Sequence, residues 1–399
     1  MAFLALFVLA ALAQAQTLTT LYSFTSGSGG SNPSAGLIQD RAGNLYGTAQ
    51  FGGDQNCIPF GCGVVYKLNT AGTETVLHSF SASDGAEPVA PLAWDKAGNI
   101  YGTAFYGGYN GSACSGDGCG TVFKIDTAGN ETLLYMFKGE SDGCWPAQGL
   151  LVDGSGNLYG TTDNCGEHGY YGTIFMVDNA GKFALLHGFT GSGGEIPMFG
   201  HLTMDKSGDL YGVTVYGGKN TACDSLGCGV LYKLSKSGTF TVLHNFKGGA
   251  SDGCNPSGTV ITDGAGNLYG TTVRCGSNNG GTIWRVTKTG RENILHNFAG
   301  GTTDGCDPQA GLTRDSKGNL FGVAFYCGAY GYGVLYELSA KGRFTLLHSF
   351  AGPPSDGAYP WGEVLLTTKG RLFSTTWNGG SGSCFYDSSG CGTVWSYVP

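Results

Sequence analysis

A five-residue motif of the form Gly-Asn-Leu-Tyr-Gly returns along the whole chain, and no other feature restricts the possible folds as strongly. Six copies begin at Gly43, Gly98, Gly156, Gly208, Gly266 and Gly318, and a degenerate seventh begins at Gly370. Successive copies start 55, 58, 52, 58, 52 and 52 residues apart. Because self-similarity at a near-fixed period is the signature of repeat architectures, the sequence predicts seven similar structural units.

Each unit divides into four short strand-like segments, which in the first unit cover residues 36–40, 45–48, 63–68 and 75–80. The segments are rich in β-branched and aromatic residues, and Asp-x-x-Gly and Asn-x-x-Gly turn signals separate the first pair and the last pair. The chain has 73 glycines among 399 residues, which disfavours helices because each glycine costs a helix roughly 1 kcal/mol relative to alanine. Four antiparallel strands per unit predict the blades of a β-propeller.

The two ends of the chain indicate how the ring closes. The seventh unit ends with residues 393–397, which form its third strand, so its fourth strand is missing. Residues 20–24, Thr-Leu-Tyr-Ser-Phe, match the Thr-Val-Leu-His-Ser-Phe pattern of the other fourth strands. An N-terminal strand in that place would protect sheet edges that an open array exposes. We therefore predict an all-β fold, a closed seven-bladed β-propeller formed by residues 16–399 as one domain.

Residues 1–15 have the pattern of a secretory signal peptide. An apolar run from Phe3 to Ala13 precedes the small-x-small sequence Ala13-Gln14-Ala15, and the run is too short to cross a bilayer as a helix. The alternative is a buried N-terminal strand. We expect export to an extracellular or periplasmic location.

The cysteines support an oxidising compartment, because their spacing is regular and does not match a zinc site. Three pairs are five residues apart, one is seven apart and three are 21 apart. Seven disulfides are therefore predicted, all on one face of the ring, where the loops before strand one and between strands two and three lie; we call it the stapled face. The predicted pairs are Cys57 with Cys62, Cys114 with Cys119, Cys223 with Cys228, Cys384 with Cys391, Cys144 with Cys165, Cys254 with Cys275 and Cys306 with Cys327.

The charge balance limits the classes of partner. Lys plus Arg is 21 and Asp plus Glu is 29, so the net charge is −8, without basic runs. Such a chain is poorly suited to nucleic acid or anionic membranes. No linear motif indicates a phosphate loop, a nucleophile elbow or a dinucleotide site. We expect a monomer without a cofactor or a metal, and without a membrane span once the signal peptide is removed.

Three motifs, Gly-Asn-Leu-Tyr-Gly-Thr, Gly-Cys-Gly-Thr-Val-Phe-Lys and Thr-Val-Leu-His-Ser-Phe, resemble those of the GloVer tandem-repeat ("choice-of-anchor") family of exported bacterial proteins. The resemblance covers about residues 17 to 397. It implies export and a propeller-like repeat array, and it brings no established activity.

Recurring polar residues are better explained by structure than by chemistry. An aspartate three residues before the first motif glycine, as at Asp40, is expected to cap its own turn. The histidines of the fourth strands, such as His78, alternate with tyrosine between units, which favours an amphipathic surface position over a metal ligand. A second aspartate set lies before glycine on the stapled face and is open to two interpretations, a turn former or a contact to a cation or sugar. Its members are Asp84, Asp142, Asp252, Asp304 and Asp356.

Aromatic residues of the stapled-face loops are the best candidates for ligand binding, because rings with polar tips suit partly wet surfaces. His201 and Glu363 stand four residues before the turn-aspartate position of their units, where most other units have a small residue. They would lie across the ring from each other, near the channel mouth, as a candidate acid/base pair. We predict a binding or interaction scaffold whose ligand is a carbohydrate or a protein; the alternatives are an extracellular carbohydrate-active enzyme, a hydrolase or lyase, and a structural cell-surface component. The candidate binding residues are Trp145, Tyr359, Trp361, Trp377, Tyr106, His201 and Glu363.

Overall fold

The computed structural model describes residues 17–399 except 56, 58, 110, 115, 199, 224 and 385–388. The predicted signal peptide lies outside the described residues. Within them, the regular structure consists of short strands and two 3-10 turns, η1 (Gly27–Gly29) and η2 (Ser112–Cys114). No helix among the described residues has the length and apolar character needed to cross a membrane.

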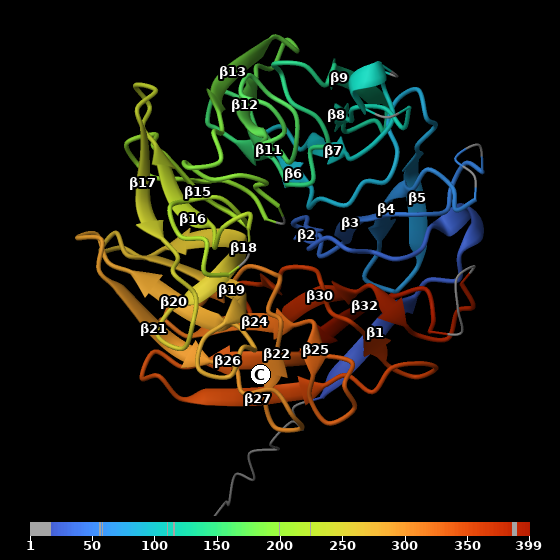
Figure 1. The fold of residues 1–399 in the computed structure, drawn as a ribbon. Helices are drawn as coiled ribbons and strands as arrows, with labels where there is room; N and C mark the ends of the chain where they lie inside the picture. Colours follow the sequence, from blue (N-terminus) through green and yellow to red (C-terminus); the bar gives the residue numbers. More distant parts are fainter. Residues whose placement is uncertain are drawn as a thin grey trace, which may run out of the picture.

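Seven four-stranded antiparallel sheets stand around a common centre, as predicted (Figure 1). In each blade the first strand is innermost and the fourth lies at the outer rim. The first four blades follow the chain directly. They are β2 (Ile38–Gln39), β3 (Leu45–Ala49), β4 (Val64–Leu68) and β5 (Glu74–Ser79); β6 (Ala93–Trp94), β7 (Ile100–Ala104), β8 (Thr121–Ile125) and β9 (Glu131–Met136); β10 (Leu151–Val152), β11 (Leu158–Thr162), β12 (Thr173–Val177) and β13 (Phe183–Gly188); β14 (Thr203–Met204), β15 (Leu210–Thr214), β16 (Val230–Leu234) and β17 (Phe240–Asn245).

The last three blades carry extra pairing toward the stapled face. Blade 5 does so through its long first two strands, and blades 6 and 7 do so through the two-stranded ladders β22–β25 and β28–β31. The strands are β18 (Gly253–Thr262), β19 (Leu268–Cys275), β20 (Thr282–Val286) and β21 (Glu292–Asn297); β23 (Thr313–Arg314), β24 (Leu320–Ala324), β26 (Val334–Leu338) and β27 (Phe344–Ser349), with β22 (Gly305–Cys306) and β25 (Tyr326–Cys327); β29 (Leu365–Leu366), β30 (Leu372–Thr376) and β32 (Thr393–Tyr397), with β28 (Gly357–Ala358) and β31 (Asn378–Gly379).

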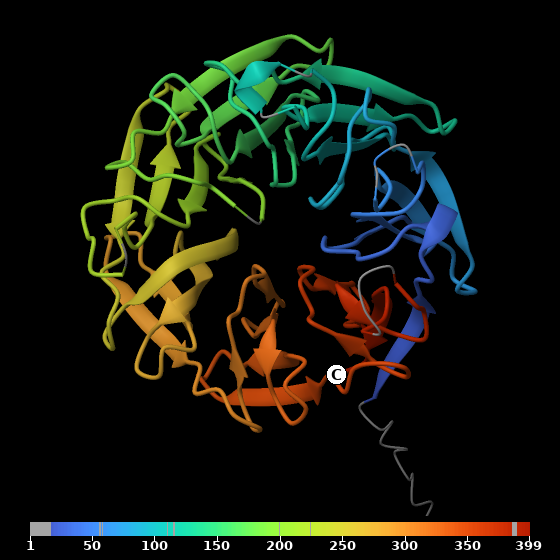
Figure 2. The ribbon, with the colours of Figure 1, turned by 45° about the vertical axis from the view of Figure 1, so that its right-hand side comes forward.

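The ring closes through β1 (Leu18–Ser23), which supplies the fourth strand of blade 7. It pairs antiparallel with β32, from Leu18 opposite Tyr397 to Ser23 opposite Thr393. Figure 2 shows this blue N-terminal strand beside the red C-terminal blade. The predicted closure is confirmed.

The repeated Leu-Tyr-Gly core has a packing reason. Gly47 on β3 lies opposite Tyr66 on β4, and a Cβ atom at Gly47 would come 2.6 Å from the Tyr66 hydroxyl oxygen. The glycine therefore makes room for the large third-strand residue. That residue in turn meets the phenylalanine that follows the fourth strand of the preceding blade; Phe80 and Phe123, for example, have ring centroids 5.0 Å apart. Such edge-to-face pairs bury apolar surface between neighbouring blades.

The turn aspartates cap their hairpins as expected. Asp40 Oδ1 accepts the Asn44 N–H at 2.9 Å, and its Oδ2 accepts the Asn44 side-chain amide at 2.7 Å. The same carboxylate accepts the Tyr46 hydroxyl at 3.0 Å. The motif tyrosine thus ties its strand to the turn that precedes it.

All seven predicted disulfides are present, and no cysteine among the described residues is free. The long-spaced bridges join the loop before strand one to the loop after strand two, whereas the short-spaced ones close the second loop on itself. The long-spaced bridges are Cys144 to Cys165, Cys254 to Cys275 and Cys306 to Cys327. The short-spaced bridges are Cys57 to Cys62, Cys114 to Cys119, Cys223 to Cys228 and Cys384 to Cys391.

The second cysteine of each short-spaced bridge lies in the core. Cys62, Cys119, Cys228 and Cys391 are all fully buried. Each stands between the two glycines that lead into the third strand of its blade, so the bridge fixes the loop at the point where the chain re-enters the sheet.

Candidate functional site

One residue of each blade, immediately before a proline on the stapled face, adopts a left-handed backbone conformation. These seven φ values fall between 52° and 61°, although none of the residues is glycine. Such conformations cost of order 1–3 kcal/mol and persist only where the surroundings impose them. We call these residues the funnel ring. They are Asn32, Glu87, Trp145, Ile196, Asn255, Asp307 and Tyr359.

Hydrogen bonds to the preceding blade impose this conformation. Where that blade has a short-spaced bridge, its buried cysteine carbonyl accepts the N–H of the funnel-ring residue. The accepting carbonyls are those of Cys62 for Glu87 at 2.9 Å, Cys119 for Trp145 at 2.8 Å, Cys228 for Asn255 at 2.9 Å and Cys391 for Asn32 at 2.7 Å. The short-spaced disulfides thus also hold the backbone that shapes the neighbouring blade's loop.

A second hydrogen bond holds the carbonyl group of the same funnel-ring residue. The carbonyl of the funnel-ring residue accepts the N–H of the residue that follows strand two, as Phe105 N–H does to Glu87 at 3.2 Å. The backbone is similar from blade to blade while the side chains differ, so the ring presents a variable set of groups on a fixed frame.

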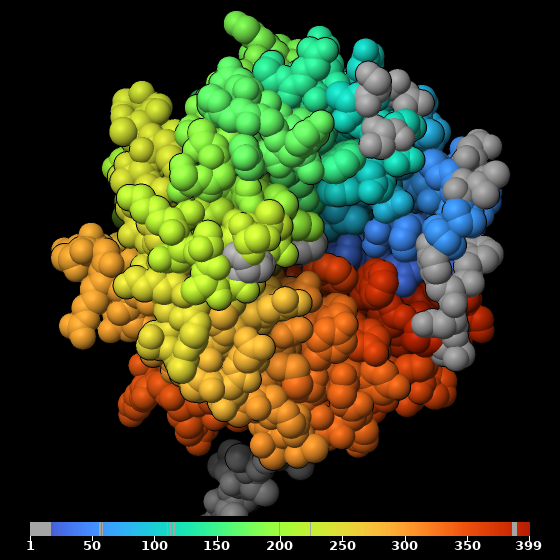
Figure 3. All heavy atoms as spheres, viewed as in Figure 1, coloured from blue at the N-terminus to red at the C-terminus, as the bar shows by residue number. Residues whose placement is uncertain are grey.

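A pocket of about 210 Å³ lies beside one member of the funnel ring, Glu87. In the space-filling view the surface dips where the blue, teal and red blades meet (Figure 3). The pocket combines one carboxyl group with aromatic and small side chains. Its lining consists of Ser34, Gln50, Glu87, Val89, Phe105, Tyr106, Ala147, Met198 and Trp361.

Glu87 is the charged group of this pocket. Gln50 Nε2 donates to its Oε2 at 2.9 Å, and Trp377 Nε1 donates to Gln50 Oε1 at 3.4 Å. Burial raises the pKa of Glu87 despite the Gln50 hydrogen bond, and the nearby Asp117 adds to the rise. Burial also raises the pKa of Tyr106, with smaller contributions from Glu87 and Asp117. Burial in the pocket therefore makes protonation of this carboxyl easier than it is in water.

The predicted aromatic residues do gather around the pocket, in two groups. Trp361 and Tyr106 line it directly. Trp377 meets Trp361 edge-on at 5.8 Å, and Tyr359 stacks on Phe325 at 5.2 Å. On the other side Trp145 stacks on Phe105 at 6.1 Å, and its indole N–H donates to the Gly118 carbonyl. All five of these predicted rings are half-buried.

His201 and Glu363 are brought together, with Nε2 and Oε2 3.8 Å apart. Glu363 Oε1 also accepts the Thr259 N–H at 2.9 Å. A Cβ atom at Gly311 would collide with the same oxygen, so the glycine makes room for the Glu363 carboxylate. Both side chains line a second cavity of about 310 Å³ among the innermost strands. The pair lies deeper than the funnel ring and does not line the 210 Å³ pocket.

The second aspartate set lies away from the funnel, at the outer rim. His78, His244, His296 and His348 approach the aspartates of their own junctions through Nε2, at 2.8 to 3.3 Å, and Tyr135 donates to Asp142 at 2.8 Å. The fourth-strand histidines are half-buried and paired in these four junctions, which sequence reasoning missed. In the two junctions of His187 and Tyr22, glycine replaces the aspartate.

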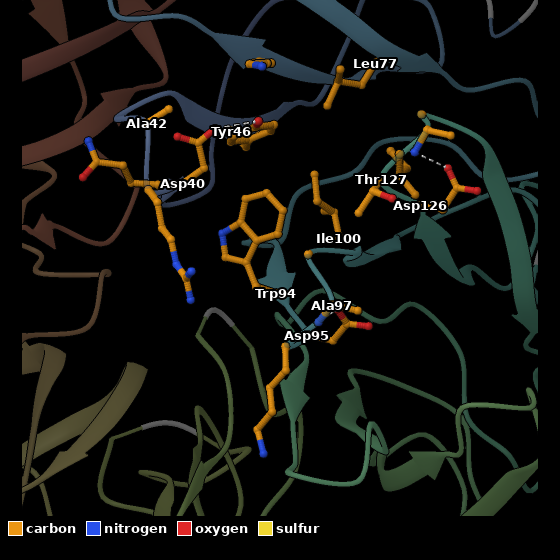
Figure 4. Close-up of a pocket in the computed structure, with 18 residues that line it drawn as sticks. Asp40, Ala42, Tyr46, Leu77, Trp94, Asp95, Ala97, Ile100, Asp126 and Thr127 are labelled. Atoms are coloured by element: carbon orange, nitrogen blue, oxygen red, sulfur yellow. Dashed lines mark hydrogen bonds between the residues drawn. The ribbon is translucent and has the colours of Figure 1, made fainter.

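A hollow of about 840 Å³ opens on the opposite face between blades 1 and 2 (Figure 4). Tyr46 and Trp94 meet edge-on in it at 4.9 Å. Its carboxylates Asp40, Asp95 and Asp126 already accept the hydrogen bonds of their own turns. These three carboxylates are therefore committed to the fold.

Residues 7–118, 111–226 and 221–399 match the family model of the Gloeobacter/Verrucomicrobia repeat. A comparison with curated proteins gave no match. Among solved structures, a streptogramin B lyase is similar with a TM-score of 0.59 at 14% identity, covering 96% of this chain and 97% of that one. The extracellular domain of a protein described as a hybrid two-component system of B. thetaiotaomicron reaches the same TM-score at 12% identity, over 96% of this chain but 41% of that one. At these identities the likeness concerns the fold alone. Since the repeat model spans nearly every residue, the chain belongs to the Gloeobacter/Verrucomicrobia repeat family.

Proposed function

We propose that the protein is an exported binding protein that takes a carbohydrate in the 210 Å³ pocket of the stapled face. The observation that carries this proposal is the convergence of the Gln50–Glu87 pair with Trp361 and Tyr106 on one pocket. The seven disulfides support export, since such bridges persist in oxidising compartments.

Carbohydrate fits the chemistry of this lining. Aromatic rings offer apolar faces to the C–H side of a sugar, and the amide and carboxyl groups exchange hydrogen bonds with hydroxyls. A pocket of about 210 Å³ is smaller than the roughly 300 Å³ at which sites for drug-sized ligands begin. We therefore expect recognition of a single terminal or branching sugar residue.

A glycan array followed by calorimetric titration tests the proposal. The unchanged protein should retain a defined glycan, and Glu87→Gln and Trp361→Ala should each weaken its binding at least about tenfold, equivalent to ~1.4 kcal/mol. Asp307→Asn is the matched control, because Asp307 occupies the same left-handed slot outside the pocket. Retention of no glycan by the folded protein, or equal binding by Glu87→Gln, would contradict the proposal. Capture of a protein through the ring residues would favour a protein ligand instead.

The raised pKa of Glu87 favours one second candidate, an extracellular carbohydrate-active enzyme in which this carboxyl acts as general acid. Glu87→Gln separates the two, since it would abolish turnover of a retained glycan even where binding survives. Absence of any turnover by the unchanged protein on the glycans it binds would exclude this candidate.

A further inference from the structure

The outer rim of the ring contains a second repeated contact. At six of the seven junctions the His or Tyr of one fourth strand faces the first residue of the next blade's fourth strand. That facing residue is glutamate at three junctions and phenylalanine at three others. The pairs are Tyr22 with Glu74, His78 with Glu131, Tyr135 with Phe183, His187 with Phe240, His244 with Glu292 and His296 with Phe344.

The phenylalanine junctions are complete as they stand. The His296 ring stacks on Phe344 with centroids 4.1 Å apart and an interplanar angle of 5°, while its Nε2 bonds Asp304. His187 stacks on Phe240 at 4.0 Å in the same way. Phenylalanine covers one face of each imidazole ring, so these junctions need no further group to pack against the histidine.

The glutamate junctions that also carry histidine and aspartate are different. Between blades 4 and 5, His244 Nε2 lies 3.3 Å from Asp252 Oδ2 and 3.6 Å from Glu292 Oε2. Between blades 1 and 2, His78 Nε2 lies 3.2 Å from Asp84 Oδ2, with a Glu131 oxygen in the same cluster. In each cluster the three donor atoms lie within 4.8 Å of one another.

Burial makes these clusters costly without a cation. The side chains of His244, Asp252 and Glu292 are 12%, 5% and 13% exposed. Glu292 Oε1 and Glu131 Oε1 are buried and have no hydrogen-bond partner among the described residues.

The spacing suits a tetrahedral metal ion. Zinc binds imidazole nitrogen and carboxylate oxygen at about 2.0–2.2 Å, so neighbouring donors around a tetrahedron stand roughly 3.3–3.6 Å apart. His78 Nε2 lies 3.2 Å from Asp84, and His244 Nε2 lies 3.3 Å from Asp252 and 3.6 Å from Glu292. The Glu131 oxygen lies within 4.8 Å of the other two donors of its cluster. One nitrogen and two oxygens are too few for calcium, which takes six to eight oxygen ligands.

We propose that the cluster of His78, Asp84 and Glu131 and that of His244, Asp252 and Glu292 each bind one divalent metal ion of the zinc type, with water in the fourth position. Each ion joins the outer edges of two neighbouring blades. This reverses the expectation from the sequence that the fourth-strand histidines are not metal ligands. The third glutamate junction serves as an internal contrast, because tyrosine replaces histidine there and Tyr22 simply donates to Glu74 at 3.1 Å.

Zinc titration of the chelator-treated protein tests the proposal, with metal content measured after desalting. We expect two Zn²⁺ per chain for the unchanged protein, one for Glu292→Phe and none for the double variant Glu131→Phe with Glu292→Phe. Each substitution recreates the junction of His296 with Phe344, which this fold already contains, so the variants should fold. Zinc should raise the melting temperature of the unchanged protein by several degrees and leave that of the double variant unchanged, because only native-state binding stabilises.

The reverse exchange strengthens the test, since Phe344→Glu should add a third zinc beside His296 and Asp304. Two zinc ions still held by the double variant, or none held by the folded unchanged protein, would overturn the proposal. The double variant should keep the glycan binding of the stapled-face pocket, so failure of this inference is distinguishable from failure of the proposed function.

Discussion

The large third-strand residues show how one slot is filled differently from blade to blade. Tyr66, Tyr232 and Tyr336 are fully buried, and their hydroxyl oxygens have no hydrogen-bond partner among the described residues. Phe123 and Phe175 fill the same place in blades 2 and 3 without a hydroxyl group. The fold therefore accepts either ring, while burying an unpaired hydroxyl carries a free-energy penalty.

Replacing Tyr66 by Phe should raise the free energy of unfolding by about 1 kcal/mol, because it removes that penalty without leaving a cavity. Tyr46→Phe should instead lower it by about 1 kcal/mol, since the Tyr46 hydroxyl donates to the Asp40 carboxylate. Denaturant unfolding of both variants checks this, and a loss of stability in Tyr66→Phe would contradict it.

His187 makes one junction sensitive to acid. Burial, helped by His168, lowers the pKa of His187 to about 4, against 6.5 in the unfolded chain. Between pH 6.5 and 4 the unfolded chain binds more protons at His187 than the folded chain does. The free energy of unfolding is therefore unaffected by the titration of this residue above pH 6.5 and falls as the pH drops toward 4. His187→Tyr should reduce the stability difference between about pH 7 and pH 4.5, since Tyr135 already stacks on Phe183 in an equivalent junction. An equal difference in both proteins, measured by denaturant unfolding, would show that His187 has no such role.

Residue-level prediction from sequence succeeded where a side chain acts on its own turn, as Asp40 does. It failed where the role depends on contacts between blades. Glu87 is a single glutamate before a proline, and nothing in the sequence shows that hydrogen bonding to the preceding blade turns its backbone left-handed. Comparing the residues before the seven prolines would have revealed the variable ring.

At the scale of elements, the middle strands of each blade match the predicted segments, but the innermost strands of every blade except blade 5 are only two residues long, shorter than expected. β2 pairs with β3 through only Ile38 and Gln39, and the apolar residue before them, Leu37, lies outside the strand. The apolar pattern continues beyond the paired residues, so a sequence pattern alone overestimates the length of the strand.

The disulfides should differ in their effect on stability according to the loop each one closes. The bridge from Cys144 to Cys165 encloses 22 residues, counting both cysteines of a separation of 21, and the chain-entropy estimate gives about 3.4 kcal/mol. The bridge from Cys57 to Cys62 encloses six residues, and the estimate gives about 2 kcal/mol. Paired Cys→Ser variants should therefore lose more stability at the first bridge, as measured by chemical denaturation under oxidising conditions. Equal losses would contradict the loop-entropy account.

At the scale of the whole molecule, the seven-bladed ring depends on a single strand contributed by the other end of the chain. β32 is buried along its whole length and has β1 as its outer partner. Phe24, directly after β1, is fully buried and meets Tyr66 of blade 1 at 5.1 Å. Loss of this strand would expose both a sheet edge and an aromatic junction.

A chain without residues 1–24 should lose cooperative unfolding and tend to aggregate, because β32 would become an exposed apolar edge. A synthetic peptide of residues 17–26 added during refolding should restore the sharp transition. The measurement is thermal unfolding followed by circular dichroism, and a truncated chain with an unchanged transition would contradict the closure argument.

The way β1 and β32 are joined also determines how the ring responds to tension. Leu18 and Tyr397 face each other at the same end of their ladder. A force applied between these two residues therefore loads the hydrogen bonds one pair at a time instead of all together. The molecule should unzip at low force from this seam, while the six other blades, each folded from one continuous stretch of chain, stay intact until the seam has opened.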